Sequence, residues 1–320
     1  MKDSCGGTSA PPPLLRLPSL PCSLGNGSCD TFQKFQKYAE AGYATTAMKR
    51  TLAIIGAGRV GRELGRRLAG HGWRVGAVVT GSRATARSAI RAIGGGTPYA
   101  RLVPEALDAG LILITTPDDA IASVARRLAR LSSGSLEGRV ALHTSGALAS
   151  EVLEPLARRG AAIGSMHPMQ TFARGRRTNL AGICFAIEGR PAARRLAVRL
   201  ARQMGGTPVV IDGHAKAAYH AAGAFASPQL LALLEAAVRL LEGSGFRRRQ
   251  AMQALLPLAR QTVANYERLG PRAAWTGPVS RGDAATIRRH ERELRKWPAE
   301  YLAAYRALTR LQRQLLSGRR

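Results

Sequence analysis

The sequence predicts an α/β fold in which a doubly wound parallel sheet is followed by an all-helical region. The first half contains short runs that are apolar at every position and alternate with helical periodicity, as in strands covered on both faces. The first run, Thr51–Ile55, passes directly into Gly56-x-Gly58-x-x-Gly61 and then into a helical pattern. From Gly213 onward, long helical segments replace this alternation. With 320 residues, 45% of them hydrophobic, the chain is large enough for more than one core.

The chain divides into three predicted parts. Residues 1–47 are rich in Pro, Ser and Gly without a sustained period, and we expect a mostly disordered extension. Residues 48–212 carry the sheet pattern and are expected to form a dinucleotide-binding Rossmann domain, whereas residues 213–320 are expected to form a helical domain. Met48 directly precedes the first strand, which suggests the hypothesis that translation begins there.

The formal charge of +28 raises the possibility of a nucleic-acid partner. The arginines are scattered in short groups such as Arg158-Arg159, Arg194-Arg195 and Arg247-Arg248-Arg249, without one basic stripe or interleaved aromatic residues. Solvated helix faces explain this distribution better, so we expect no nucleic-acid partner.

The apolar runs are each interrupted by a charged residue before they reach the roughly 18 residues of a membrane span. We therefore expect a soluble protein without a membrane partner. Three of the four cysteines, Cys5, Cys22 and Cys29, lie in the first thirty residues, and Cys184 lies in the patterned body. This distribution argues against a disulfide framework and fits a reducing cytoplasm. No metal site is expected.

The glycine-rich turn after the first strand predicts a dinucleotide site. Gly56 would permit the tight turn, Gly58 would let the backbone approach a pyrophosphate, and Gly61 would let the helix pack closely on the strand. The intervening Ala57, Arg59 and Val60 complete the predicted cofactor loop, with the phosphates at the positive end of the helix. The alternative is a structural turn without a ligand.

The end of the second predicted strand, Trp73–Thr80, indicates which dinucleotide is preferred. An Asp or Glu at this point would bind the ribose of NAD, but the sequence has no acid there. Thr80, Ser82 and Arg83 instead supply hydroxyls and a guanidinium group, which suit a 2′-phosphate. We therefore expect NADP rather than NAD, the alternative being an ordinary loop arginine.

A third run apolar on both faces starts at Leu111 and is expected to be a central parallel strand. It is followed by Thr115, Thr116 and Pro117, which would face the crevice where open α/β sheets bind ligands. We expect Asp118 chiefly to cap the helix Ala120–Leu131.

Two further passages from strand to loop end in polar groups. His143 and Ser145 follow one strand and His167 follows the other, with the helix-like segment Ala147–Arg158 between them. A lone His on a strand is more often a packed core residue, but two at neighbouring strand ends favour a function near the nicotinamide. The last predicted elements are the strands Gly182–Ile187 and Pro208–Ile211, with the helix Pro191–Met204 between them.

The helical region begins with a segment that carries candidate catalytic groups. Lys216 and His220 are spaced i and i+4 on a face of small residues, and Tyr219 beside them is a candidate substrate contact. The alternative is a lysine that reaches solvent and a packed histidine. Pro228 is expected to kink or split this first helix. The predicted helices are Ala215–Leu241, Arg248–Leu269, Ala284–Trp297 and Ala299–Leu316.

The loop between the second and third of these helices offers a second set of polar groups. Arg281 could pair with an anionic substrate, and Thr276 could hydrogen-bond to it. The alternative is a plain turn in which Asp283 caps the helix that carries His290.

Taken in order, these motifs resemble Rossmann-like proteins whose C-terminal part is the domain of unknown function 2520. The resemblance covers roughly residues 50–294. It rests on Gly56-Ala-Gly-Arg-Val-Gly61, Thr116-Pro-Asp-Asp-Ala-Ile121, His143-Thr-Ser-Gly146, His167-Pro-Met-Gln-Thr-Phe172, Ala218-Tyr-His-Ala-Ala-Gly223 and Thr276-Gly-Pro-Val-Ser-Arg-Gly-Asp283.

Relatives of that family include prephenate dehydrogenases, pyrroline-carboxylate reductases and hydroxyacid dehydrogenases of the 6-phosphogluconate type. The resemblance implies a helical domain of the 6-phosphogluconate dehydrogenase C-terminal type, which holds substrate and forms a homodimer. His167-Pro168-Met169 is similar to a segment of prephenate dehydrogenases, and Lys216 lies where hydroxyacid dehydrogenases carry an active-site lysine. The chain has Ser227-Pro228 where the family usually has Ser-Asn, which removes an amide near the expected cleft.

The leading hypothesis is an NADP-dependent oxidoreductase that transfers hydride between nicotinamide and a small, anionic carbonyl or imine substrate. Lys216 or His220 would act as general acid, His167 and Ser145 would orient substrate and ring, and Arg281 would pair the substrate's charge. The alternative is a sensor that binds the dinucleotide without catalysis.

Overall fold

The computed structural model describes residues 48–173 and 175–318. The extension expected at residues 1–47, with its three cysteines, lies outside the described residues. The strands are β1 Thr51–Ile55, β2 Arg74–Val79, β3 Thr97–Tyr99, β4 Leu111–Ile114, β5 Val140–His143, β6 Ala162–Pro168, β7 Cys184–Gly189 and β8 Thr207–Val210.

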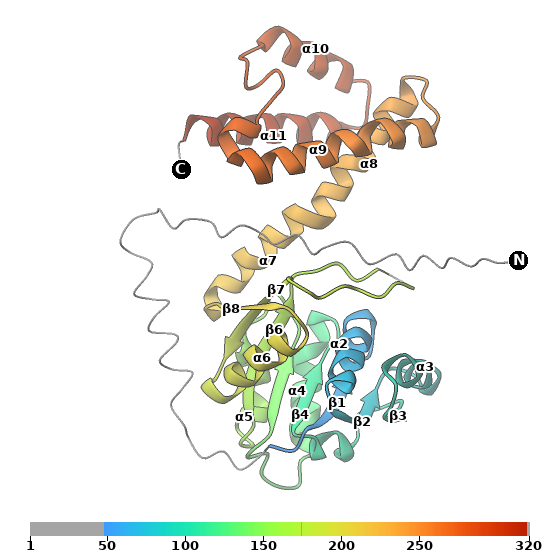
Figure 1. Ribbon diagram of the computed structural model, residues 1–320, viewed down its shortest axis with the longest axis vertical. Coiled ribbons are helices and arrows are strands. Elements are labelled where there is room, and N and C mark those ends of the chain that lie inside the picture. Colours follow the sequence, from blue (N-terminus) through green and yellow to red (C-terminus); the bar gives the residue numbers. More distant parts are fainter. Residues whose placement is uncertain (1–47, 174, 319–320) are drawn as a thin grey trace, which may run out of the picture. The chain divides into compact units, whose positions relative to one another are not determined.

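These eight strands form one sheet in the order β3-β2-β1-β4-β5-β6-β7-β8. Neighbouring strands pair in parallel except β6 and β7, which are antiparallel. Figure 1 shows β3 and β8 at opposite edges. The predicted α/β class is confirmed, and its sheet is dominated by parallel pairs. The short edge strand β3 was not predicted, because three residues are too few to show a period.

Helices cover both faces of the sheet. Alternate residues of β1 point to opposite sides, so Leu52 and Ile54 pack in one buried cluster and Ala53 and Ile55 in another. The first cluster includes side chains of α2, α3 and α6, and the second includes side chains of α4 and α5. These helices are α2 Arg59–Gly70, α3 Arg83–Ile93, α4 Asp118–Leu131, α5 Glu154–Ala157 and α6 Pro191–Gln203. This double cover explains why the strand sequences are apolar at every position.

The segment predicted as one helix over Ala147–Arg158 is shorter and divided. A 3₁₀ turn spans Ser150–Leu153 and continues into the four-residue α5. Pro155 at the start of α5 lacks a backbone N–H and suits that position. Residues 147–149 therefore form a loop beside the end of β5.

After β8 the chain is helical, as predicted. A 3₁₀ turn, Gly213–Ala215, leads into α7 Lys216–Ala224, a π-helical segment Phe225–Gln229 and α8 Leu230–Gly243. The π segment contains Pro228, so the expected interruption occurs where the missing N–H removes a helical hydrogen bond. The remaining helices are α9 Arg248–Ala274, α10 Ala284–Leu294 and α11 Ala299–Ser317.

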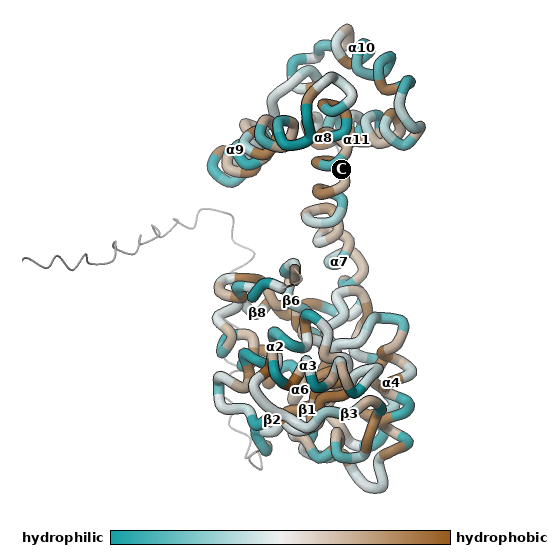
Figure 2. The backbone as a smooth tube through the Cα atoms, turned by 90° about the vertical axis from the view of Figure 1, so that its right-hand side faces the viewer, coloured by the Kyte–Doolittle hydropathy of each residue, from teal (hydrophilic) through white to brown (hydrophobic). Residues whose placement is uncertain are grey.

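The helix over Gly213–Gly243 corrects the expectation that charges interrupt every apolar run. Residues 217–234 contain no Asp, Glu, Lys or Arg. The helix has a mean hydropathy of 1.4 in its most apolar window and is therefore long and apolar enough to cross a membrane. Only 6% of that window is buried, and the tube from α7 to α8 is mostly white to brown in Figure 2. A large apolar helix face is thus uncovered in the single chain.

The antiparallel contact between β6 and β7 fixes a register that matters for the site. Gly164 pairs with Gly189, and Ser165 pairs with Glu188. Gly189 has a φ of 133°, and a Cβ added there would lie 2.6 Å from the carbonyl oxygen of Ile163. The two strands approach so closely here that glycine is required. This register places the Glu188 carboxylate beside Ser165.

Candidate functional site

The central strands end in register, which brings their following loops to one edge of the sheet. Ile55 pairs with Ile114, Ile114 with His143, and His143 with Ser165. The glycine turn follows Ile55, and the other three strand ends lead into loops or residues that carry polar groups. Ligands of open α/β sheets bind at this edge.

The glycine turn has the geometry that a pyrophosphate requires. Gly56 has a φ of 86°, and a Cβ there would lie 2.6 Å from Cγ2 of Thr116. Gly58 is exposed, precedes α2 and provides no side-chain cap for it. Because the first turn of a helix has backbone N–H groups without intrahelical partners, this end of α2 can bind an anion.

The two threonines after β4 have different surroundings. The Thr115 hydroxyl donates to the carbonyl oxygen of Gly56 at 2.7 Å and so stabilises the turn. The buried Thr116 hydroxyl has no hydrogen-bond partner among the described residues. A buried hydroxyl of this kind is costly unless something binds to it. The turn, the helix end and Thr116 together fit a dinucleotide phosphate.

The other predicted cofactor residues lie around this turn. Ala57 is buried, Val60 is half-buried, and the Arg59 guanidinium donates to the carbonyl oxygen of Phe172 at 3.0 Å. Pro117 is exposed and immediately precedes α4.

At the end of β2, hydroxyl groups and an arginine precede and begin α3. Thr80 donates to the carbonyl oxygen of Ser82 at 2.8 Å, and Ser82 accepts from the backbone N–H of Thr85 at 3.2 Å. Ser82 is therefore an N-cap. Arg83 is exposed, and its guanidinium group makes no hydrogen bond to another of the described residues.

Lys216, the first residue of α7, is fully buried at the same edge of the sheet, so the interpretation of a lysine that reaches solvent is wrong. Its Nζ donates to the carbonyl oxygen of Ser145 at 2.9 Å and to Oγ of Ser165 at 2.7 Å. Burial lowers the pKa of Lys216 to about 8, although the negative charges of Glu188 and Asp118 oppose this shift.

Ser145 joins the loops after β4 and β5. Its hydroxyl donates to Oδ2 of Asp118 at 2.8 Å and accepts from the backbone N–H of Leu148 at 3.0 Å. The expectation that Asp118 mainly caps α4 is wrong. Pro117 occupies the cap position, and the Asp118 carboxylate bonds to Ser145 instead.

His167, Tyr219 and His220 form a cluster over the loop after β5. His167 Nδ1 lies 2.9 Å from the Tyr219 hydroxyl, and the His167 and His220 rings are 5.7 Å apart with nearly perpendicular planes. Burial raises the pKa of Tyr219, so its protonated hydroxyl donates to His167 Nδ1. Burial and the neighbouring His220 and Lys216 lower the pKa of His167 to about 4, which leaves its ring neutral.

Gly146 lies directly under these two imidazole rings. A Cβ at Gly146 would lie 2.5 Å from Cδ2 of His220 and 2.9 Å from Nε2 of His167. The approach of the rings therefore depends on the missing side chain.

His143 belongs to the interior of the sheet rather than to the exposed cluster. Its Nδ1 accepts from the backbone N–H of Ser145 at 3.2 Å, and its Nε2 has no partner within hydrogen-bond distance among the described residues. Burial, with repulsion from Lys216, lowers the pKa of His143 to about 3. It is thus a neutral core residue that shapes the Ser145 loop.

The loop with Thr276 and Arg281 is separate from these contacts. Both side chains are exposed, and none of the hydrogen bonds recorded among the described residues joins them to the strand ends. Asp283 accepts from the backbone N–H of Thr286 at 3.0 Å, so the expected cap of α10 is present.

Sequence reasoning missed Ser165 and Glu188. Both are buried, on facing positions of β6 and β7. Ser165 lies inside an apolar strand pattern, and Glu188 directly follows the predicted strand Gly182–Ile187. A carboxylate at the end of a buried strand is the signal that could have revealed the second of them.

Comparisons with known proteins agree with this architecture. A model of the Rossmann-like domain matches residues 39–168, and a model of the domain of unknown function 2520 (DUF2520) matches residues 183–312. A comparison with curated proteins finds no match.

Three solved structures show the likeness of fold. A proposed NADP oxidoreductase of Bacteroides fragilis has a TM-score of 0.69 and 24% identity, over 82% of this chain and 98% of that chain. A reductive aminase of Aspergillus terreus, solved with NADPH and ethyl-5-oxohexanoate, has a TM-score of 0.61 and 18% identity, over 84% and 94%. A pyrroline-5-carboxylate reductase of Coxiella burnetii has a TM-score of 0.53 and 14% identity, over 83% and 98%.

The G146A substitution tests the packing around the histidine pair. We expect it to lower the free energy of unfolding by about 1–3 kcal/mol, because the added methyl group must displace one of the rings. Urea unfolding measures this change. Gly223→Ala in α7 is the control, since it meets no atom within 4 Å and should be neutral or slightly stabilising. Equal effects of the two substitutions would contradict the crowding at Gly146.

Proposed function

We propose that this chain, which combines a Rossmann-like domain with the domain of unknown function 2520, is an NADP-dependent oxidoreductase. Its substrate would be a small carbonyl or imine compound, and the substrate's negative charge would suit the basic chain. The observation that carries the proposal is the position of the buried Lys216 ammonium group. It bonds to the loop after β5, at the edge of the sheet where the glycine turn leads into α2.

The cofactor assignment rests on the glycine turn and on Arg83. The N-terminus of α2 and the Thr116 hydroxyl would hold the pyrophosphate, and Arg83 would pair with the 2′-phosphate of NADP. The fold matches of this chain include a reductive aminase solved with NADPH, which supports the same choice. When bound, NADPH supplies a hydride from its nicotinamide ring.

Lys216 is the strongest candidate for the proton donor. An ammonium group has three N–H donors, and the hydrogen bonds to Ser145 and Ser165 use two of them. The third would serve the oxygen or nitrogen atom that gains charge as hydride arrives, and since Lys216 is fully buried, substrate binding must open its surroundings to admit that atom. A pKa of about 8 means that the group is charged at neutral pH and can still release its proton.

His167, His220 and Tyr219 would orient the substrate. Since Tyr219 donates to Nδ1 of the neutral His167, the Nε2 atom of His167 carries the remaining ring proton. This N–H group and the exposed His220 ring offer hydrogen bonds beside Gly146. Ser145 holds the loop through Asp118 and presents its carbonyl oxygen to Lys216. We keep Arg281 and Thr276 as proposed substrate contacts.

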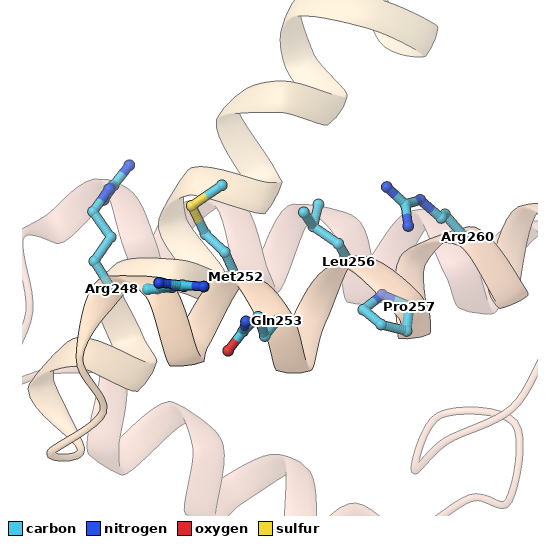
Figure 3. Close-up of a pocket in the computed structure, with 7 residues that line it drawn as sticks. Arg248, Met252, Gln253, Leu256, Pro257 and Arg260 are labelled. Atoms are coloured by element: carbon cyan, nitrogen blue, oxygen red, sulfur yellow. The ribbon is translucent and has the colours of Figure 1, made fainter.

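We propose that a second copy of the chain covers the apolar faces of the helical region. Large exposed apolar side chains occur on the π segment, α8, α9 and α11, not on one helix alone. They include Phe225, Leu231, Leu258, Val263, Tyr266 and Leu315. An open groove along one side of α9 adds Met252 and Leu256 between arginines (Figure 3). Exposed apolar side chains in this number favour an interface.

A bilayer explains this surface less well. The helix that is long enough to span a membrane starts with residues that are tied to the sheet, since Lys216 is buried and Tyr219 bonds to His167. Those residues cannot enter lipid while the contacts persist. The proposed homodimer is consistent with a cytoplasmic enzyme.

The first test concerns the cofactor. We expect NADPH to bind more tightly than NADH, and R83A to weaken NADPH binding by about 10- to 100-fold, the value of one charged hydrogen bond. NADH binding should be unchanged in this variant. Fluorescence titration measures both affinities. Arg87→Ala, an exposed arginine one helical turn along α3, is the control. Equal losses for NADPH and NADH, or no loss, would contradict the role of Arg83.

The second test concerns catalysis. K216M should reduce the rate of NADPH oxidation by about 10²- to 10⁴-fold while NADPH affinity is retained, because it removes the proton donor. Initial rates are measured over a panel of keto acids, ketones and cyclic imines. Lys296→Met removes an exposed lysine and should have no effect. NADPH binding without turnover of any compound would instead favour a sensor.

The third test concerns assembly. L231E should convert a dimer into a monomer in sedimentation experiments, because a carboxylate would be buried in the interface without a partner. Arg126→Glu on the exposed side of α4 makes a larger change of charge and should leave the dimer intact. A wild-type chain that sediments as a monomer would overturn this assignment.

A further inference from the structure

Glu188 is a buried carboxylate that the proposed reaction does not use. It is 7% exposed and belongs to β7, next to the glycine that lets β6 and β7 approach closely. Its Oε1 accepts from the Ser150 hydroxyl at 2.6 Å, and its Oε2 accepts from the Ser150 backbone N–H at 2.8 Å. Three hydrogen bonds, counting the one to Ser165, hold this carboxylate in one orientation.

Ser165 connects this carboxylate to Lys216. The Ser165 hydroxyl accepts from Lys216 Nζ at 2.7 Å and donates to Oε2 of Glu188 at 3.4 Å. One serine thus lies between two opposite charges in the interior of the protein. No ion pair within 4.0 Å joins Lys216 to a carboxylate among residues 48–173 and 175–318.

The other ionisable groups near Lys216 do not replace Glu188. Asp118 on α4 is also negative, but it is exposed and bonds to Ser145. His143 on β5 and His167 on β6 are both neutral, because burial lowers the pKa of each well below 7. A buried ammonium group loses several kcal/mol of hydration free energy unless an opposite charge and hydrogen bonds compensate. Of the two negative charges, only that of Glu188 is shielded from solvent.

We propose that Glu188 is a positioning residue for Lys216: through Ser165, its buried carboxylate keeps the ammonium group charged and aimed at the strand ends. This role rests on the proposed function of Lys216 as a proton donor. Without the carboxylate, burial would favour the uncharged amine, which is not an acid near neutral pH. The Glu188 carboxylate would therefore stabilise the positive charge of Lys216, and the Ser165 hydroxyl would fix the position of its ammonium group.

The titration of Lys216 can be followed directly. The chain has six lysines, Lys2, Lys34, Lys37, Lys49, Lys216 and Lys296, so selective ¹⁵N labelling of lysine side chains gives few NMR signals. The signal lost in K216M identifies Lys216. In the wild-type full-length chain we expect Lys216 to titrate with a midpoint at about pH 8. E188Q keeps the shape of the side chain and removes its charge, and it should lower the midpoint by about one pH unit or more.

Matched variants separate this role from a structural one. E188D keeps the charge, so its Lys216 titration midpoint should lie close to the wild-type value. E137Q removes an exposed carboxylate before β5 and should leave it unchanged. S165A removes the bridge, and the Lys216 N–H signals should then broaden as the group exchanges with water. An unchanged midpoint in folded E188Q would overturn the proposal. If E188Q fails to fold, an unchanged midpoint and an equally sharp signal in S165A would overturn it.

The outcome does not depend on turnover. NADPH titration of the same variants reports the cofactor site, and the NMR midpoint reports Lys216 without substrate. If turnover is measurable, the alkaline limb of its pH profile should move down in E188Q by the same amount as the midpoint. A shifted midpoint with no turnover in the wild-type protein would leave Glu188 as the group that charges Lys216 and would reject the oxidoreductase instead.

Discussion

Burying an ammonium group costs more hydration free energy than most single contacts in a protein contribute to stability. The arrangement of the site follows from the contacts that compensate this cost at Lys216. The ammonium group donates to the carbonyl oxygen of Ser145 and to the hydroxyl oxygen of Ser165, and Ser165 in turn donates to the Glu188 carboxylate. These acceptors come from the loop after β5 and from β6. The first residue of α7 is thereby fixed to the strand ends, so the helical region begins with a polar anchor rather than a flexible joint.

That anchor determines which groups can act together. Once Lys216 is in place, the helical spacing carries Tyr219 and His220 to His167 and Gly146, where the rings pack without an intervening side chain. On the cofactor side, Asp118 and Ser145 join the loop after β4 to the loop after β5. The segment after β4, whose Thr115 bonds to the glycine turn, is therefore joined through Asp118 and Ser145 to the proposed proton donor.

Local patterns explain what the sequence could predict. Apart from β3, the strands from Thr51 to Val210 and the long helices each have their own periodicity, and their class is confirmed. The Lys216 pair with His220 was recognised from spacing, but its burial was not, because burial depends on where α7 docks. Glu188 was missed for the same reason, since the register of β6 and β7, set by two glycines in contact, makes it face Ser165. Asp118 was assigned to a helix cap because an acidic residue at the start of a helix suits a cap. Its hydrogen bond to Ser145 could not be seen in the sequence, since Ser145 lies 27 residues away.

We propose that the glycine turn and the Lys216 anchor face one ligand. A crystal structure of the NADPH complex tests this arrangement most directly. We expect the pyrophosphate at the backbone N–H groups that begin α2, and the nicotinamide ring beside Gly146 within reach of the Lys216 side chain. A nicotinamide bound away from Gly146, with Lys216 still enclosed by protein alone, would contradict it and would leave the anchor as a purely structural device.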